Sequence, residues 1–182
     1  MTTLSRELIR RALVRLGELA DAEGIKLEVC IYGGAALMLA YDSRAITKDV
    51  DAVVRPSDVA QRLTRRVAEE LELPENWIND DVRMFAAPRE GLRALPWDSA
   101  GIAVTVPTAS YLLAMKALAC RKALPGYEGD IADLRFLLRK LEITSVSHVQ
   151  EHIDRYYPDD VIRAEDEALI AELIEEVRRE HS

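Results

Sequence analysis

Two aspartates, Asp49 and Asp51, stand on either side of a valine in the segment DVDAVV. The segment otherwise has the apolar character of a buried strand, where residues two apart point to the same face, roughly 7 Å from each other. Two carboxylates on one buried face repel each other and are costly to remove from water unless a positive charge compensates them. Either a nearby cation (Arg44, Lys48 or Arg55) compensates them, or a divalent cation such as Mg²⁺ does.

Two adjacent glycines, Gly33 and Gly34, precede this pair, at the point where an expected strand turns into a short apolar helix. Glycines at such a turn allow a phosphate to approach the backbone, and the first N–H groups of the helix face the anion. A glycine pair before a helix also occurs as a simple tight turn. The order of glycine turn, short helix and strand with two aspartates is the more specific pattern, and it favours a site for a metal ion and a phosphorylated ligand.

A lysine in an apolar helix is the third unusual feature. Lys116 is the only charged residue between Ala100 and Cys120, and helical spacing places it on an apolar face. Lysine is almost never fully buried without a partner. Asp130 or Asp133 on the next expected helix is one candidate partner, and the phosphates of a bound nucleotide are the other.

The elements that position these residues follow from hydrophobic periodicity and turn signals. A helix is expected over Thr3–Ala22, and Ser57 is the expected N-cap of a second helix with an apolar face. The segment from Glu72 to Leu92 reads as irregular. Three strands are expected in KLEVCIYGG, DVDAVV and GIAVTVP, and after residue 107 four helices are expected at about 108–124, 128–141, 145–155 and 162–180.

This pattern predicts an α+β protein with a small mixed sheet flanked by helices over residues 1–107. An α-helical C-terminal region, packed on the first, is predicted over residues 108–182. The chain has 182 residues with 49% apolar content, which is enough for a sizeable core. No uncharged stretch approaches the roughly 18 residues of a membrane span, and the charged N-terminus lacks the apolar run of a signal peptide. Cys30 and Cys120 read as reduced core residues, so we expect a cytoplasmic protein without membrane contact.

The segment GGAALMLAYDSRAITKDVDAVV resembles the nucleotidyltransferase superfamily, which has the DNA polymerase β-like fold. It is similar to the variant in minimal bacterial nucleotidyltransferases, where a Gly-Gly turn, a helix and an R-x-x-T segment precede D-x-D. The segments WINDDVRMF and LLAMKALACRKALPGYEGDIADLRFLL also resemble these proteins, notably the AbiEii and MenT-like toxins of toxin–antitoxin systems. The resemblance covers about residues 30–140, and its first motif is the more specific one.

The resemblance implies a role for each matching residue. Gly33 and Gly34 match a phosphate-binding turn, Asp49 and Asp51 match metal-binding carboxylates, and Arg44 and Thr47 match the lead-in that contacts the nucleotide. Catalytic roles fall to the following matches: Asp49, Asp51, Lys116, which would contact nucleotide phosphates, and Asp130, an acidic residue of the toxin motif.

Two departures from the family pattern are visible. Gly34 stands where the superfamily usually has serine, and the strand GIAVTVP lacks the third carboxylate of many active members, with Asp98 outside it. Either Asp130 takes over part of that role, one metal ion suffices, or the site is degenerate.

The implied reaction moves an NMP from an NTP to an acceptor hydroxyl with Mg²⁺ or Mn²⁺, and the resemblance points to a tRNA 3′ end or another RNA. A protein side chain or a small molecule is the alternative acceptor, and a cognate antitoxin is an expected partner. A catalytically inactive interaction module is the rival, with the apolar stripe of the last helix as its contact surface.

The net charge of −8 argues against broad nucleic-acid binding. A local basic rim could still hold RNA: Arg62, Arg65, Arg66, Arg83, Arg89, Arg93, Arg121 and Lys122.

Overall fold

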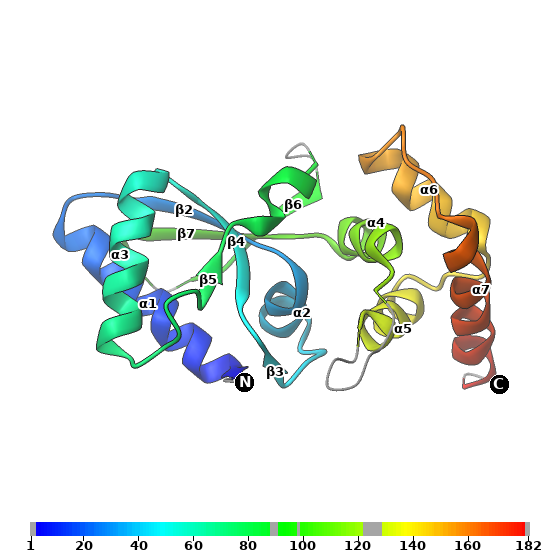
Figure 1. Ribbon diagram of the computed structural model, residues 1–182, viewed down its shortest axis with the longest axis horizontal. Coiled ribbons are helices and arrows are strands. Elements are labelled where there is room, and N and C mark those ends of the chain that lie inside the picture. Colours follow the sequence, from blue (N-terminus) through cyan, green and yellow to red (C-terminus); the bar gives the residue numbers. More distant parts are fainter. Residues whose placement is uncertain (1–2, 88–90, 98, 122–128, 181–182) are drawn as a thin grey trace. The chain divides into compact units, whose positions relative to one another are not determined.

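The computed structural model describes residues 3–87, 91–97, 99–121 and 129–180 (Figure 1). The chain divides into two compact units. The first unit comprises Met1–Ala86 and Leu92–Pro107, and the second comprises Ala87–Gly91 and Thr108–Ser182. The first unit contains the strands together with three α-helices and the second is helical, so the expected α+β class is confirmed.

The first unit is built around a mixed five-stranded sheet. The elements of this unit are β1 (Leu4–Ser5), α1 (Arg6–Ala22), β2 (Leu27–Ile31), α2 (Gly33–Tyr41), β3 (Ile46–Thr47), β4 (Val50–Arg55), α3 (Ser57–Glu70), β5 (Ile78–Asn79), the 3-10 helix η1 (Asp81–Phe85), β6 (Leu92–Leu95) and β7 (Ile102–Pro107). The strand order of the sheet is β5-β4-β2-β7-β6. Strand β2 pairs with β4 antiparallel and with β7 parallel, while β5 lies parallel to β4 and β6 antiparallel to β7. A separate two-stranded ladder joins β1 and β3.

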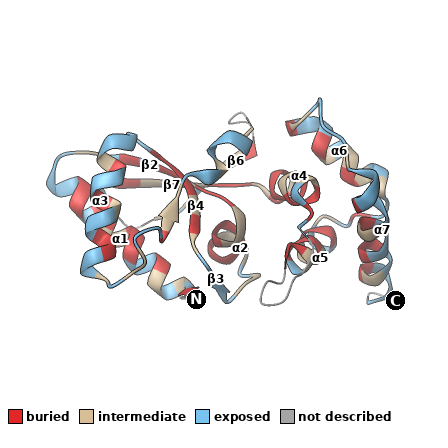
Figure 2. Ribbon diagram, viewed as in Figure 1, coloured by how far each residue is buried: buried red, intermediate tan, exposed pale blue. Residues whose placement is uncertain are grey.

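The core of this unit forms where helices cover the central strands. Helices α1 and α3 pack against each other and against β7 and β4, and α2 also packs on β4 and β7. Strands β2, β4 and β7 are largely buried (Figure 2). The Trp77 side chain is buried too, and its indole Nε1 donates to the Thr64 carbonyl at 3.1 Å. Strand β4, which carries Asp51, therefore lies in the closely packed centre of the unit.

The second unit consists of helices that pack on one another. They are α4 (Ala109–Ala119), α5 (Ile131–Lys140), α6 (Val146–Tyr156) and α7 (Ala164–Arg179). Helix α4 packs on α5 and α6, and α7 also contacts α5 and α6. The apolar stripe of α7 is buried within this unit, at Ile170, Leu173, Ile174 and Val177. The stripe therefore serves as core of its own unit.

Several element boundaries differ from expectation, each for a local reason. The first helix begins at Arg6 and not at Thr3, because Leu4 and Ser5 pair with β3 and the Ser5 hydroxyl caps the helix by accepting from Leu8 N–H at 3.2 Å. Ser57 is not an N-cap. It is the first residue of α3, and the carbonyl of Pro56 accepts the first helical bond from Ala60.

The fourth helix is shorter than expected because its backbone turns left-handed after Ala119. Cys120 has φ 34, a conformation that ends a helix. Asp98, Arg89 and Lys122 lie outside the described residues. Strands β5 and β6 lie in or at the end of the segment expected to be irregular; they are short and take their structure from pairing with β4 and β7. Among the helices that the structure describes, none has the length and apolar character needed to cross a membrane.

Candidate active site

The two aspartates flank the first residue of a central strand. Asp49 directly precedes β4 and Asp51 is its second residue; both are half-buried, while Val50 between them is fully buried. The backbone carbonyl of Asp51 accepts a hydrogen bond of 2.8 Å from the N–H of Tyr32, the residue before the glycine turn. This bond fixes the start of β4 beside the end of β2.

The turn between β2 and α2 depends on Gly33. Its φ of +56° is in the left-handed region, and a Cβ on it would lie 2.8 Å from Oδ2 of Asp51. The carboxylate of Asp51 therefore rests against the bare Cα of Gly33, in space that any side chain would occupy. Helix α2 starts at this glycine, and the first N–H groups of a helix have no carbonyl partner within it. A carboxylate and a helix N-terminus thus converge on one point.

Arg44 and Thr47 of the R-x-x-T segment lie against the second glycine, Gly34. A Cβ on Gly34 would lie 2.6 Å from Nη1 of Arg44 and 3.0 Å from Oγ1 of Thr47. Both side chains lie against the first turn of α2, and β3, which ends in Thr47, pairs with β1. The structure therefore brings together five of the predicted site residues: Gly33, Gly34, Arg44, Thr47 and Asp51.

Asn79 belongs to this group and was not predicted from the sequence. Its side-chain Nδ2 donates to Oδ2 of Asp49 at 3.3 Å, and strand pairing places Asn79 opposite Asp51. The only signal was the segment WINDDVRMF, because a two-residue strand has no periodicity of its own.

Lys116 and Asp130 lie in the second unit and form a buried ion-pair cluster there. The Lys116 Nζ lies 2.6 Å from Oδ1 of Asp130 and 2.8 Å from Oδ2 of Asp133, and all three residues are at most 5% exposed. Both proposed carboxylate partners are therefore present. For Lys116 to contact a phosphate, its ammonium would have to leave these two carboxylates, so its catalytic role stays a prediction.

Arg121 completes the cluster around Asp130. Its backbone N–H and its Nε donate to Oδ2 of Asp130 at 3.1 and 3.0 Å. Burial by itself would raise the pKa of Asp130, but the hydrogen bond from Arg121 and the charge of Lys116 outweigh it, so the pKa lies below its ordinary value. Asp130 is thus an ionised carboxylate near neutral pH and holds two cations.

The arginines of the expected basic rim bond within the chain. Arg62 pairs with Glu23, Arg66 with Glu70, and Arg121 with Asp130. The remaining described arginines of the rim are also engaged: Arg65 with Glu75, Arg83 with Asp80, and Arg93 with the ring of Tyr41. The rim residues are therefore largely neutralised, which is the usual state of a solvated surface.

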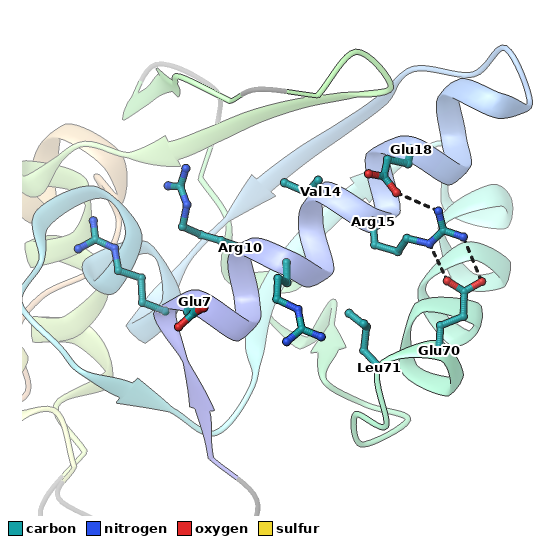
Figure 3. A pocket seen from close by; sticks show the side chains of 9 residues that line it. Glu7, Arg10, Val14, Arg15, Glu18, Glu70 and Leu71 are labelled. Carbon is teal, nitrogen blue, oxygen red and sulfur yellow. Dashed lines mark hydrogen bonds and ion pairs between the residues drawn. The ribbon is translucent and has the colours of Figure 1, made fainter.

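A groove of about 710 Å³ runs along α1 and the C-terminal end of α3 (Figure 3). Arg15 bonds Glu70 and Glu18 across it, and three further arginines of α1 line it beside Glu7. The hydrogen bond from Arg15 stabilises the ionised carboxylate of Glu70 and lowers its pKa to about 2. None of the predicted site residues lines this groove.

In the parts of the chain that the structure describes, no group of three or more His, Cys, Asp or Glu side chains could hold a metal ion. The aspartate pair would thus need oxygen atoms from a substrate to complete the shell of a metal ion. Comparisons of the chain with protein-family models, with curated proteins and with solved structures found no match.

Proposed function

We propose that this protein is a metal-dependent nucleotidyltransferase, which moves an NMP from an NTP to an acceptor hydroxyl. The observation that carries the proposal is the contact between the carboxylate of Asp51 and the bare Cα of Gly33, where α2 begins. A phosphate and a metal ion need this combination of carboxylate oxygen, unobstructed backbone and helix N-terminus at one place.

The residues present fit a Mg²⁺ or Mn²⁺ ion. Asp49 and Asp51 would hold it with their half-buried carboxylates, and Mg²⁺ is usually held by one or two carboxylates together with substrate phosphates. When bound, the ion would neutralise charge on the triphosphate and make the α-phosphorus easier to attack. This requirement for few protein ligands matches the two carboxylates found.

The chain's own residues bind and orient the reactants. The first N–H groups of α2 and the guanidinium of Arg44 bind phosphate oxygens, and the glycine turn lets them approach. Asp51 accepts the proton of the acceptor hydroxyl as the acceptor oxygen bonds to the α-phosphorus. The bond from this phosphorus to the bridging oxygen breaks, and pyrophosphate leaves. Catalysis of this kind depends mainly on positioning and charge.

The acceptor that we propose is an RNA hydroxyl, with the 3′ end of tRNA first, and the setting a toxin–antitoxin system with a cognate antitoxin. This part of the proposal rests on the sequence motifs. A protein side chain and a small molecule remain the alternative acceptors. Lys116 and Asp130 are assigned to catalysis by the motifs alone.

The test is label transfer from each of four α-³²P-labelled NTPs, with Mg²⁺, to total bacterial tRNA and to the protein itself. We expect the wild type to label RNA, and Asp49→Asn or Asp51→Asn to lower labelling by more than about 100-fold, beyond the 10- to 100-fold cost of losing an outer-shell group. The matched control is Asp58→Asn, an exposed acid in the first turn of α3. Melting curves of all variants establish that they fold.

Label on the protein alone would make a protein side chain the acceptor. Equal labelling by wild type and by both aspartate variants would refute the proposed site. Absence of both labelling and Mg²⁺-dependent NTP binding in the wild type would favour a catalytically inactive interaction module.

A further inference from the structure

Asn79 is tied to the aspartate pair by strand pairing. Strand β5 runs parallel to β4, with Val50 opposite Ile78 and Asp51 opposite Asn79. Residues opposite each other on neighbouring strands point to the same face of a sheet. The side chain of Asn79 therefore shares a face with the carboxylates of Asp49 and Asp51, and all three are half-buried.

The orientation of the Asn79 amide is fixed by its two partners. Its Oδ1 accepts a hydrogen bond from the backbone N–H of Asp81 at 3.1 Å, and that N–H can only donate. The Nδ2 end must then face Asp49, where it lies 3.3 Å from Oδ2. An ionised carboxylate can only accept, so the two bonds agree on one orientation of the amide.

This arrangement has a physical consequence for Asp49. A hydrogen bond from a neutral donor stabilises a carboxylate and holds it in one orientation, without adding a charge that would compete with a cation. Oδ2 of Asp49 accepts this bond from Asn79, so a cation bound by the same carboxylate would use mainly the other oxygen. In known metal sites, partners of this kind change metal affinity by roughly 10- to 100-fold.

We propose that Asn79 is a positioning residue for the metal site, which acts by orienting the carboxylate of Asp49. The inference rests on the proposed function, since it requires that Asp49 bind a divalent cation. The inference also concerns the third carboxylate that the family pattern would supply. On this face of the sheet the third polar side chain is the neutral amide of Asn79, which orients the Asp49 carboxylate and adds no charge.

The experiment measures Mn²⁺ binding to the purified chain by electron paramagnetic resonance of the free ion. A non-hydrolysable NTP analogue supplies the phosphate oxygens without turnover, and a sample without protein gives the Mn²⁺ that the analogue binds by itself. Asn79→Leu keeps the approximate volume of the side chain and removes the donor. We expect it to weaken Mn²⁺ binding by about 10- to 100-fold. Asn76→Ala, at an exposed asparagine three residues earlier, is the matched control and is expected to bind as the wild type does.

A double-mutant cycle separates action through Asp49 from a general effect on the fold. In the Asp49→Asn background we expect Asn79→Leu to cause no further loss of Mn²⁺ affinity, because the carboxylate that it orients is gone. An equal loss in both backgrounds would overturn the inference, and so would wild-type affinity in Asn79→Leu.

The two proposals fail in different ways. If the wild type binds Mn²⁺ no better than Asp49→Asn, the proposed metal site is wrong and the role of Asn79 falls with it. If Asp49→Asn binds Mn²⁺ measurably more weakly than the wild type, while Asn79→Leu binds normally, only the role of Asn79 is wrong.

Discussion

At the scale of single residues, Gly33 combines two requirements that are usually separate. Its backbone has a positive φ, and its missing side chain leaves the space that the Asp51 carboxylate occupies. Gly24 has a similar φ of +68°, but a Cβ there would meet nothing within 4 Å. The chain therefore contains a natural reference for the cost of backbone strain alone.

We predict that Gly33→Ala abolishes nucleotidyl transfer while Gly24→Ala leaves it unchanged. Both substitutions should lower the free energy of unfolding by about 1–2 kcal/mol, the usual cost of a left-handed alanine. Only the first one displaces the Asp51 carboxylate. Denaturant unfolding and label transfer on both variants test this. Full activity in Gly33→Ala would show that the position of that carboxylate is unimportant.

At the scale of elements, the long periodic segments were predictable and the short paired ones were not. The three strands expected from their β-branched composition are present as β2, β4 and β7. Strands β5 and β6 have only two and four residues. They form because they pair with β4 and β7, and their composition alone does not predict them.

The same division holds for the site. The glycine turn and the aspartates were predicted from residue order, and Arg44 and Thr47 from the family resemblance. In the structure Asp51 lies against Gly33, and Arg44 and Thr47 lie against Gly34. Asn79 comes from a strand that forms only by pairing, so sequence reasoning missed it. For Lys116 the sequence left two kinds of partner open, a carboxylate of Asp130 or Asp133 and the phosphates of a nucleotide. The structure pairs its ammonium with both carboxylates, as a buried lysine requires.

Helix α1 crosses the start of β7 at very close range, and this contact gives a second prediction. A Cβ on Gly101 would lie 2.0 Å from the carbonyl oxygen of Gly17 and 2.6 Å from the backbone N of Asp21. Both obstacles are backbone atoms and cannot rotate away. We predict that Gly101→Ala lowers the free energy of unfolding by about 3 kcal/mol, the upper range for overpacking.

Thermal or denaturant unfolding of this variant tests the prediction. The comparison is Arg15→Ala, which removes the exposed ion pair between α1 and α3 and should lower the free energy of unfolding far less, because water screens an exposed pair. Equal costs for the two variants would show that α1 can shift on the sheet without penalty.

At the scale of the whole molecule, the two units offer separate spectroscopic probes. The chain has two tryptophans, and both Trp77 and Trp97 belong to the first unit. Tryptophan emission therefore reports on that unit alone, whereas helical ellipticity reports on both units. A transition that is seen in ellipticity and not in emission belongs to the second unit. The buried cluster of Lys116, Asp130 and Asp133 lies wholly in the second unit, so acid should weaken that unit through a group that can be identified.

The third prediction concerns how stability depends on pH. The folded pKa of Asp130 lies below the ordinary value of about 3.9, so its ionisation stabilises the folded state above that value. This stability is lost as the pH falls below about 4, because the unfolded chain then binds a proton that the folded carboxylate resists.

We predict that Asp130→Asn is less stable than the wild type by about 1–3 kcal/mol at pH 7, the cost of lost charge-assisted bonds. The difference should shrink between pH 5 and pH 3. Glu175→Gln, which removes an exposed acid of the same unit, should show no such narrowing. Denaturant unfolding followed by ellipticity at each pH decides the matter, and a constant difference across this range would mean that Asp130 is not held as an ion by Arg121 and Lys116.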